Sequence, residues 1–172
     1  SVPNLLNKIG AMISNEVLLI VGFEGSLPVV RAASETAQSF LHRGRDLGPE
    51  PGLHWFSHRH DVSYKLAPVF IAGAFADTME VATTWDRLPK LYQCVRQALA
   101  KNVAVMAHFS HAYPEGCSIY FSFAGKGNLR VYDKTGRSAL SAARKAGGTV
   151  THHHGVGILK AEEAAKEAGE AI

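Results

Sequence analysis

The sequence predicts an α/β domain of the α+β type, in which an antiparallel sheet carries helices on one face. Between residues 74 and 153, strand-like and helix-like segments follow one another in the order β-α-β-β-α-β, which is the ferredoxin-like arrangement. That order favours an antiparallel sheet with helices packed on one side. Of the 172 residues, 47% are hydrophobic, which is enough for a single core. We therefore expect one domain over residues 1–172.

The first third of the chain is expected to add a strand and two helices. Residues 16–24 (EVLLIVGFE) are rich in Val, Leu and Ile and predict a buried strand. A helix is predicted over residues 28–43, and the Gly and Pro residues of segment 44–52 predict a loop. A second helix is expected over residues 54–66 and should stop at Pro68. The strand and the first helix would extend the sheet.

The rest of the chain is expected to form the ferredoxin-like core. Leu88, Leu91, Val95 and Leu99 fall at helical spacing and predict a helix with one apolar side. A last helix, rich in Ala, Glu and Lys, is expected beyond Ile158. In chain order, the predicted elements are a strand over 75–81, a helix over 87–100, strands over 103–109 and 117–124, a helix over 131–146 and a strand over 149–153.

The segment 117–123 alternates strictly between apolar and polar residues. Ile119 and Phe121 are expected to point into the core under the helices, because alternate residues of a strand face the same side. Tyr120, with a serine two residues away on each side, is expected on the opposite, polar face. This places Tyr120 within reach of a ligand or of solvent, and the alternation alone does not distinguish the two.

Three consecutive histidines, His152 to His154, are followed by two glycines at positions 155 and 157. In a strand, His152 and His154 would share one face and His153 would take the other. Imidazoles change charge near neutral pH, so the run suits a site that handles anions or protons. The glycines allow a sharp turn and the close approach of a ligand. A surface loop and a metal site are the alternatives.

His108 and His111 stand three residues apart near the expected end of a strand. Together with the triple run they could supply metal ligands, since zinc takes three or four in a tetrahedral array. Neither H-E-x-x-H nor a pair of C-x-x-C motifs is present, so we predict no metal ligands. Glu80 could hold an arginine or lie in solvent, and the sequence does not decide between them.

Composition excludes several other classes of protein. The formal net charge is +3 and the 18 Lys and Arg residues are scattered, so no nucleic-acid partner is predicted. The two cysteines are those of a reduced, cytoplasmic protein without a disulfide framework. No apolar run is long enough to cross a membrane. The sequence also lacks a G-x-G-x-x-G motif, a P-loop and a G-x-S-x-G elbow, so no flavin-binding or nucleotide-binding machinery is visible.

Two segments carry a family resemblance when they are taken together. They are residues 110–121 (SHAYPEGCSIYF) and residues 146–157 (AGGTVTHHHGVG). The pair resembles the C-terminal domain of the FAD-linked oxidases, in the alkyldihydroxyacetonephosphate synthase branch of the vanillyl-alcohol-oxidase superfamily. Residues 80–87, with Glu80 and the stretch TTWDR, resemble the family's segment ahead of the same helix. The resemblance runs from about residue 16 to residue 170.

The resemblance implies a substrate-binding cap domain from a larger flavoenzyme. A separate N-terminal domain of the same protein would bind most of the FAD, and the substrate would be a small hydroxy or phosphate-bearing molecule. By the same resemblance, Tyr120 would be the catalytic acid/base, and the catalytic histidines would be His152, His153 and His154. His153, His154 and Gly155 would also contact the cofactor. A homodimer is compatible with this interpretation.

The resemblance also implies an arginine on the helix before the strand that starts near Phe75, and the nearest match is Lys65. Lysine does not grip phosphate or carboxylate bidentately, so another hydroxy compound, as in glycolate oxidase-like enzymes, is an equal expectation. Arg59 and His111 are further candidates for holding the substrate. The alternative function is a free-standing α/β module that binds a small anion or a metal through its histidines.

Overall fold

The structure is a computed structural model, and it describes residues 17–61 and 66–169. The described residues divide into two compact units, residues 17–61 and residues 66–169. The expectation of a single domain over residues 1–172 stays a prediction. Within the described ranges, no helix is both long and apolar enough to cross a membrane.

The unit over residues 17–61 contains the helices α2 (Leu27–Leu41) and α3 (Glu50–His58). The prediction of a buried strand over residues 16–24 is wrong for residues 17–24, which are exposed and form no strand. Their apolar side chains favour burial, but a strand also needs a neighbour that accepts its backbone hydrogen bonds. Helix α3 begins four residues before the predicted start at residue 54 and ends at His58. Residues 62–65, the end of that predicted helix, lie outside the described residues.

The other unit begins with a short helix, α4 (Ala67–Ile71), that the sequence did not predict. Pro68 lies in its first turn, so the expectation that Pro68 stops a helix is wrong. Proline is well suited to this place, because the first turn of a helix uses no backbone N–H of its own residues and proline fixes the backbone angle that a helix needs. Helix α4 leads directly into the sheet.

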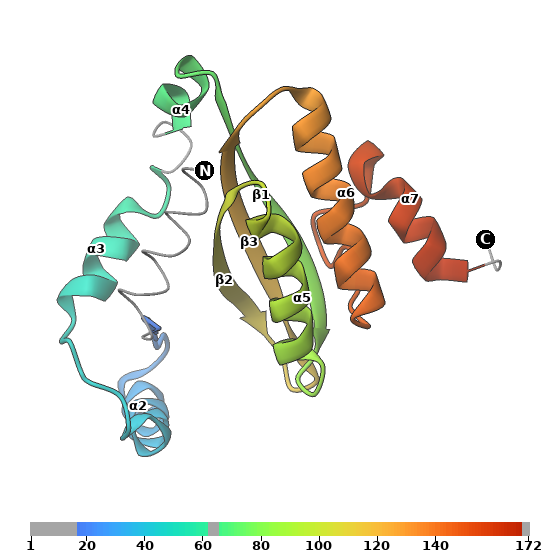
Figure 1. The fold of residues 1–172 in the computed structure, drawn as a ribbon. Helices are drawn as coiled ribbons and strands as arrows, with labels where there is room; N and C mark the ends of the chain where they lie inside the picture. The colour runs from blue at the N-terminus through green and yellow to red at the C-terminus, as the bar shows by residue number, and fades with distance from the viewer. Residues whose placement is uncertain (1–16, 62–65, 170–172) are drawn as a thin grey trace. The chain divides into compact units, whose positions relative to one another are not determined.

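The sheet has three antiparallel strands in the order β1-β3-β2. Strand β1 spans Ala74–Thr84, β2 spans Ala104–Ala112 and β3 spans Gly116–Lys126. Helices α5 (Leu88–Ala100) and α6 (Leu129–Lys145) pack against each other on one face of the sheet (Figure 1). The antiparallel α+β fold predicted from the element order is therefore confirmed.

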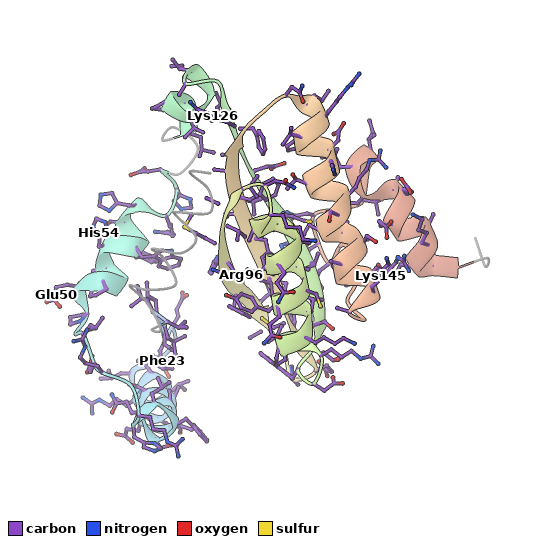
Figure 2. The ribbon with its side chains drawn as sticks, in the orientation of Figure 1. Phe23, Glu50, His54, Arg96, Lys126 and Lys145 are labelled. Carbon is purple, nitrogen blue, oxygen red and sulfur yellow. The ribbon has the colours of Figure 1, made fainter. Side chains whose placement is uncertain are left out.

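The core lies between this sheet and its two helices. Ile119 and Phe121 of β3 are fully buried there, and so are Leu91, Val95 and Leu99 of α5. These are the residues that strand alternation and helical spacing assigned to the core. Three basic side chains of the unit are labelled in Figure 2: Arg96 lies on α5, Lys126 at the end of β3 and Lys145 at the end of α6.

The predicted fourth strand over residues 149–153 is reduced to one isolated bridge. Thr149 and Ala82 exchange two backbone hydrogen bonds of 2.9 and 3.2 Å, and the chain then bends away through residues 152–154. The next pair of this ladder would join Thr151 with Glu80, but the N–H of Thr151 faces Oγ1 of Thr149 at 3.5 Å, and the carbonyl of Glu80 accepts from the ammonium of Lys160 at 2.9 Å. The N–H of His152 donates to the buried Glu80 side chain at 3.1 Å. Helix α7 (Gly157–Ala168), the predicted last helix, follows and packs beside α6 (Figure 1).

Candidate functional site

Tyr120 stands at the centre of the sheet face that lies opposite the core. Its direct partners across the sheet are Glu80 on β1 and His108 on β2. Residues directly opposite each other in antiparallel strands share a face, so the three side chains form one row across the sheet. The neighbours of Tyr120 along β3, Ile119 and Phe121, point into the core instead. The strand alternation therefore places a carboxylate, a phenol and an imidazole together on one surface.

The bend at residues 152–154, which we call the histidine loop, lies over this row. The bridge between Thr149 and Ala82 fixes the start of the loop beside β1. Gly155, with a φ of +77°, turns the chain at its end, a backbone angle that glycine adopts without strain. The predicted alternation of the histidines between two faces is wrong, because the loop is bent and not extended. The bend brings His152, His153 and His154 to the same side of the sheet.

The hydroxyl of Tyr120 contacts two of these imidazoles. Its oxygen lies 2.5 Å from Nε2 of His153 and 3.2 Å from Nε2 of His154. His111 adds a fourth imidazole to the group, with its ring 4.5 Å from that of His153 and 6.3 Å from that of Tyr120. The structure thus brings together the catalytic candidates that the sequence suggested, although they come from different strands and a loop.

His111 reaches the group because of a β-bulge in β2. The pairing with β3 shifts between Ser110 and Ala112, and His111 is the extra residue. It is also the one residue other than glycine with a positive φ, +45°, in the part of the chain that the structure describes. A bulge redirects a side chain and interrupts the ladder. Here it turns the imidazole toward the histidine loop, where Ser110 Oγ lies 3.1 Å from its Nδ1.

Glu80 is the residue of the site that sequence reasoning left undecided. Its side chain is fully buried beneath the histidine loop. Oε1 lies 3.3 Å from Nδ1 of His153 and 3.7 Å from Nδ1 of His152. The sequence does carry a signal for it, because Glu80 stands between Met79 and Val81 in the middle of a strand, where a charged residue needs a partner to be buried.

Lys160 of α7 provides part of that partnership. Its ammonium donates to the backbone carbonyl of Glu80 at 2.9 Å and lies 3.7 Å from Oε2 of the side chain. Helix α7 also holds the segment just before the histidine loop, since the Glu167 carboxylate accepts a 2.8 Å hydrogen bond from the N–H of Val150. The last helix therefore fixes the loop and the carboxylate at two separate points.

Burial and charge shift the pKa values of the central groups. Burial raises the pKa of the Tyr120 hydroxyl, and the negative charge of Glu80 and the hydroxyl of Tyr113 raise it further. Burial lowers the pKa of His153; the Glu80 carboxylate opposes this effect, and the neighbouring imidazoles add to it. The resting pair is a neutral phenol beside a neutral imidazole.

A cavity of about 400 Å³ opens beside the site. His152 forms part of its wall together with Ser118 and Tyr113. The hydroxyl of Ser118 is buried and donates to the carbonyl of Ser110 at 3.0 Å, so it holds the wall and offers no free donor. The cavity gives a small molecule a place next to the histidine loop.

Of the predicted substrate-binding residues, His111 is the one that lies among the described residues of this unit. Arg59 ends α3 in the other unit, where its guanidinium lies 3.8 Å from the centre of the Phe56 ring and donates to the Phe56 carbonyl. Lys65 lies outside the described residues. The roles proposed for Arg59 and Lys65 therefore stay predictions, whereas His111 lies within the group of imidazoles around Tyr120.

Comparison with known protein families gives a match over almost the whole chain. Residues 10–172 match the family model described as the FAD linked oxidases, C-terminal domain. The match includes β1, β3 and the histidine loop, the segments that carry the site. The sequence resemblance to this family is therefore confirmed.

Individual relatives point to one branch of that family. The chain is 30% identical over 156 residues to an alkyldihydroxyacetonephosphate synthase of Dictyostelium discoideum, and 27% identical over 161 residues to one of Trypanosoma brucei brucei. These matches cover 83% and 86% of the chain and 26% of each relative. A solved alkyldihydroxyacetonephosphate synthase structure matches 74% of the chain and 25% of its own length, with a TM-score of 0.61 and 23% identity, which shows a shared fold. The chain thus spans about a quarter of the length of these relatives.

Proposed function

The chain belongs to the family of C-terminal domains of FAD-linked oxidases, and from that membership we propose that it forms the substrate side of a flavoenzyme active site. In this proposal Tyr120 exchanges a proton with the substrate through its hydroxyl. His153 acts as the immediate partner of that hydroxyl. Glu80 orients His153 from below.

The chain of contacts from Glu80 through His153 to Tyr120 carries the proposal. Oε1 of Glu80 lies 3.3 Å from Nδ1 of His153, and Nε2 of the same ring lies 2.5 Å from the hydroxyl of Tyr120. A carboxylate beside Nδ1 favours the tautomer with the proton on that nitrogen, which leaves Nε2 free to accept a proton. His153 can therefore take the proton of Tyr120 as Tyr120 takes one from the substrate, and return it afterwards.

This arrangement offsets the raised pKa of Tyr120. A phenol with a pKa above its ordinary value is a poor base by itself at neutral pH. Transfer of its proton to His153 as Tyr120 takes one from the substrate avoids a phenolate, and the carboxylate of Glu80 stabilises the imidazolium that forms. Positioned proton transfer of this kind contributes about 10²–10⁴-fold to the rates of enzymes.

The exposed edge of the histidine loop fits a flavin ring. His154 and Gly155 are exposed, and no atom lies within 4 Å of the point where a side chain of residue 155 would begin. A planar ring can therefore approach the backbone there. When bound, the flavin would accept electrons from the substrate, and no side chain of this site can do so. The neighbouring imidazoles can hold negative charge on the ring or on the substrate.

The substrate that we propose is a small hydroxy or phosphate-bearing molecule. The relatives are named alkyldihydroxyacetonephosphate synthases, so a dihydroxyacetone phosphate derivative is one candidate and another hydroxy compound is the other. The cavity next to His152 is of a size that suits such molecules. Most of the FAD contacts would come from an N-terminal domain of the longer protein.

The test is the substitution Tyr120→Phe in the full-length protein that contains a flavin domain. The change removes one hydroxyl and keeps the ring, so we expect flavin absorbance to persist and turnover to fall by about 10²-fold or more. His108→Phe is the matched control, since His108 lies in the same cross-strand row and its ring is 6.0 Å from that of Tyr120. The control should keep most of its turnover. Near-normal turnover of Tyr120→Phe would exclude the acid/base role.

A further inference from the structure

We propose that Glu80, His152 and His153 form a three-ligand site for a divalent transition-metal ion such as Zn²⁺. The three ligand atoms are Oε1 of Glu80 and the Nδ1 atoms of the two histidines, and they lie within 4.8 Å of one another. Neutral imidazole nitrogen and carboxylate oxygen are preferred zinc ligands, and three protein ligands leave a fourth position for water or a small molecule. The proposed function requires no metal. An ion on Nδ1 of His153 would take the place of the proton that the proposed function puts on that nitrogen, so the metal-bound form and the proton-transferring form are alternative states of the same residues.

The spacing of the three atoms matches a tetrahedral ion. The two Nδ1 atoms are 2.9 Å apart, and Oε1 lies 3.3 Å from one of them and 3.7 Å from the other. Zinc bonds of about 2.1 Å to nitrogen and oxygen place the ligands of a tetrahedron about 3.4 Å apart. The three separations lie on both sides of this value. An ion can therefore enter with small adjustments of two partly exposed side chains.

The buried carboxylate supplies an independent sign of a missing partner. Oε1 of Glu80 is buried and has no hydrogen-bond partner among the described residues. Burial of a charged oxygen without a partner is costly, and cations or donors normally satisfy such atoms. The second oxygen, Oε2, is held by the N–H of His152 at 3.1 Å. The carboxylate is therefore anchored through one oxygen and directs the other toward the imidazoles, as ligating carboxylates commonly do.

Lys160 limits how tightly the ion is held. Its ammonium lies 3.7 Å from Oε2 and neutralises part of the Glu80 charge. With three ligands and a nearby positive charge, the site should be weaker than a structural zinc site with four ligands. The pattern of ligands also explains why no zinc motif is visible in the sequence. Two ligands are adjacent in the chain, and the third comes from a strand about seventy residues earlier.

The test measures binding of Zn²⁺ to this chain, after treatment with a chelator, by isothermal titration calorimetry. Co²⁺ serves as a second probe, since a tetrahedral site gives it intense visible absorption. We expect binding of one ion per chain. Glu80→Gln and His153→Gln should each weaken binding by about tenfold or more, because each removes one ligand of three.

His154→Gln is the matched control that separates this site from unspecific binding by a histidine run. His154 directs its Nε2 toward Tyr120 and is not one of the three ligands. The proposal predicts that His154→Gln changes the affinity by less than about threefold. Equal losses for all three histidines, or unchanged affinity in Glu80→Gln, would show adventitious binding and overturn the proposal. If circular dichroism shows that Glu80→Gln is unfolded, the comparison of His152→Gln with His154→Gln decides the question.

Discussion

Tyr120 and Phe121 are neighbours on β3, yet the two faces of the sheet place them in opposite surroundings. Phe121 is fully buried, and its ring stacks on that of Tyr92 at 6.1 Å in the core. Tyr120 is half-buried and faces Glu80 and the imidazoles of the histidine loop. One strand can therefore serve both stability and chemistry, because successive side chains point to opposite faces of the sheet. Changes on the two faces should therefore have separable effects.

The largest effect on stability is expected from the core face. Phe121→Ala leaves a cavity under α5 and should lower the free energy of unfolding by about 3–5 kcal/mol. Urea denaturation followed by circular dichroism measures this loss. Phe109→Ala is the control, because Phe109 is 44% exposed and its removal should cost clearly less. Equal losses for the two variants would contradict the assignment of Phe121 to the centre of the core.

Gly148→Ala tests whether packing in the core affects the position of the histidine loop on the opposite face of the sheet. A methyl group there would lie 2.0 Å from Cδ1 of Leu91 and 2.9 Å from the carbonyl oxygen of Ala82. We expect a loss of about 1–3 kcal/mol from overpacking, together with shifted NMR signals of the histidine rings. Gly136→Ala on α6 has open space around it and should stabilise the chain by about 0.5–1 kcal/mol. Unchanged histidine signals in Gly148→Ala would show that the loop does not depend on this packing.

A reciprocal pair of substitutions sharpens the comparison between the faces. Tyr120→Phe removes a hydroxyl from the polar face and should change the free energy of unfolding by less than about 1 kcal/mol, since water can replace the lost contact. Phe121→Tyr adds a hydroxyl to the core without a partner and should cost about 1–3 kcal/mol. Chemical denaturation of both variants gives the two values. A larger loss for Tyr120→Phe than for Phe121→Tyr would reverse the assignment of the faces.

The smallest effect is a pH dependence of stability from His153. Its pKa is lowered in the folded chain, so the unfolded chain takes up the proton first as the pH falls through about 6.5. Acid therefore favours the unfolded state, and stability declines until the folded form is also protonated. Melting temperatures at about pH 7.5 and about pH 5.5 should differ less in His153→Gln than in the unchanged chain. The same difference in both proteins would contradict the lowered pKa.

Much of the fold could be predicted because local patterns determine it. The alternation in β3 placed Ile119 and Phe121 in the core, and the helical spacing in α5 did the same for Leu91. The family resemblance rested on residues 110–121 and 146–157, and the family match confirms it. The apolar segment 17–24 shows the limit of this reasoning. Hydrophobic residues indicate a need for burial, but they do not reveal which neighbour provides it.

The site was only partly predictable because its members meet through tertiary structure. Tyr120 and the three histidines could be named, but their mutual positions depend on a bend that replaces a strand. Within the bend, the N–H of His152 donates to the carboxylate of Glu80, two residues that no local pattern connects. Glu80, the residue that the sequence left undecided, thus contacts the loop through both of its carboxylate oxygens.

Strand β3 pairs with β1 on one side and with β2 on the other, and the two pairings should respond differently to the insertion or deletion of a residue. The reason is the β-bulge at His111. Strand β2 already contains one unpaired residue, so deletion of His111 would leave a regular ladder with β3. The pairing of β3 with β1 contains no extra residue: eleven consecutive pairs run from Ala74 with Lys126 to Thr84 with Gly116. Loss of one residue from β3 would exchange its faces, turning the tyrosine inward and the phenylalanine outward. Among related sequences, insertions and deletions should therefore gather near residue 111 and avoid the segment around residue 120.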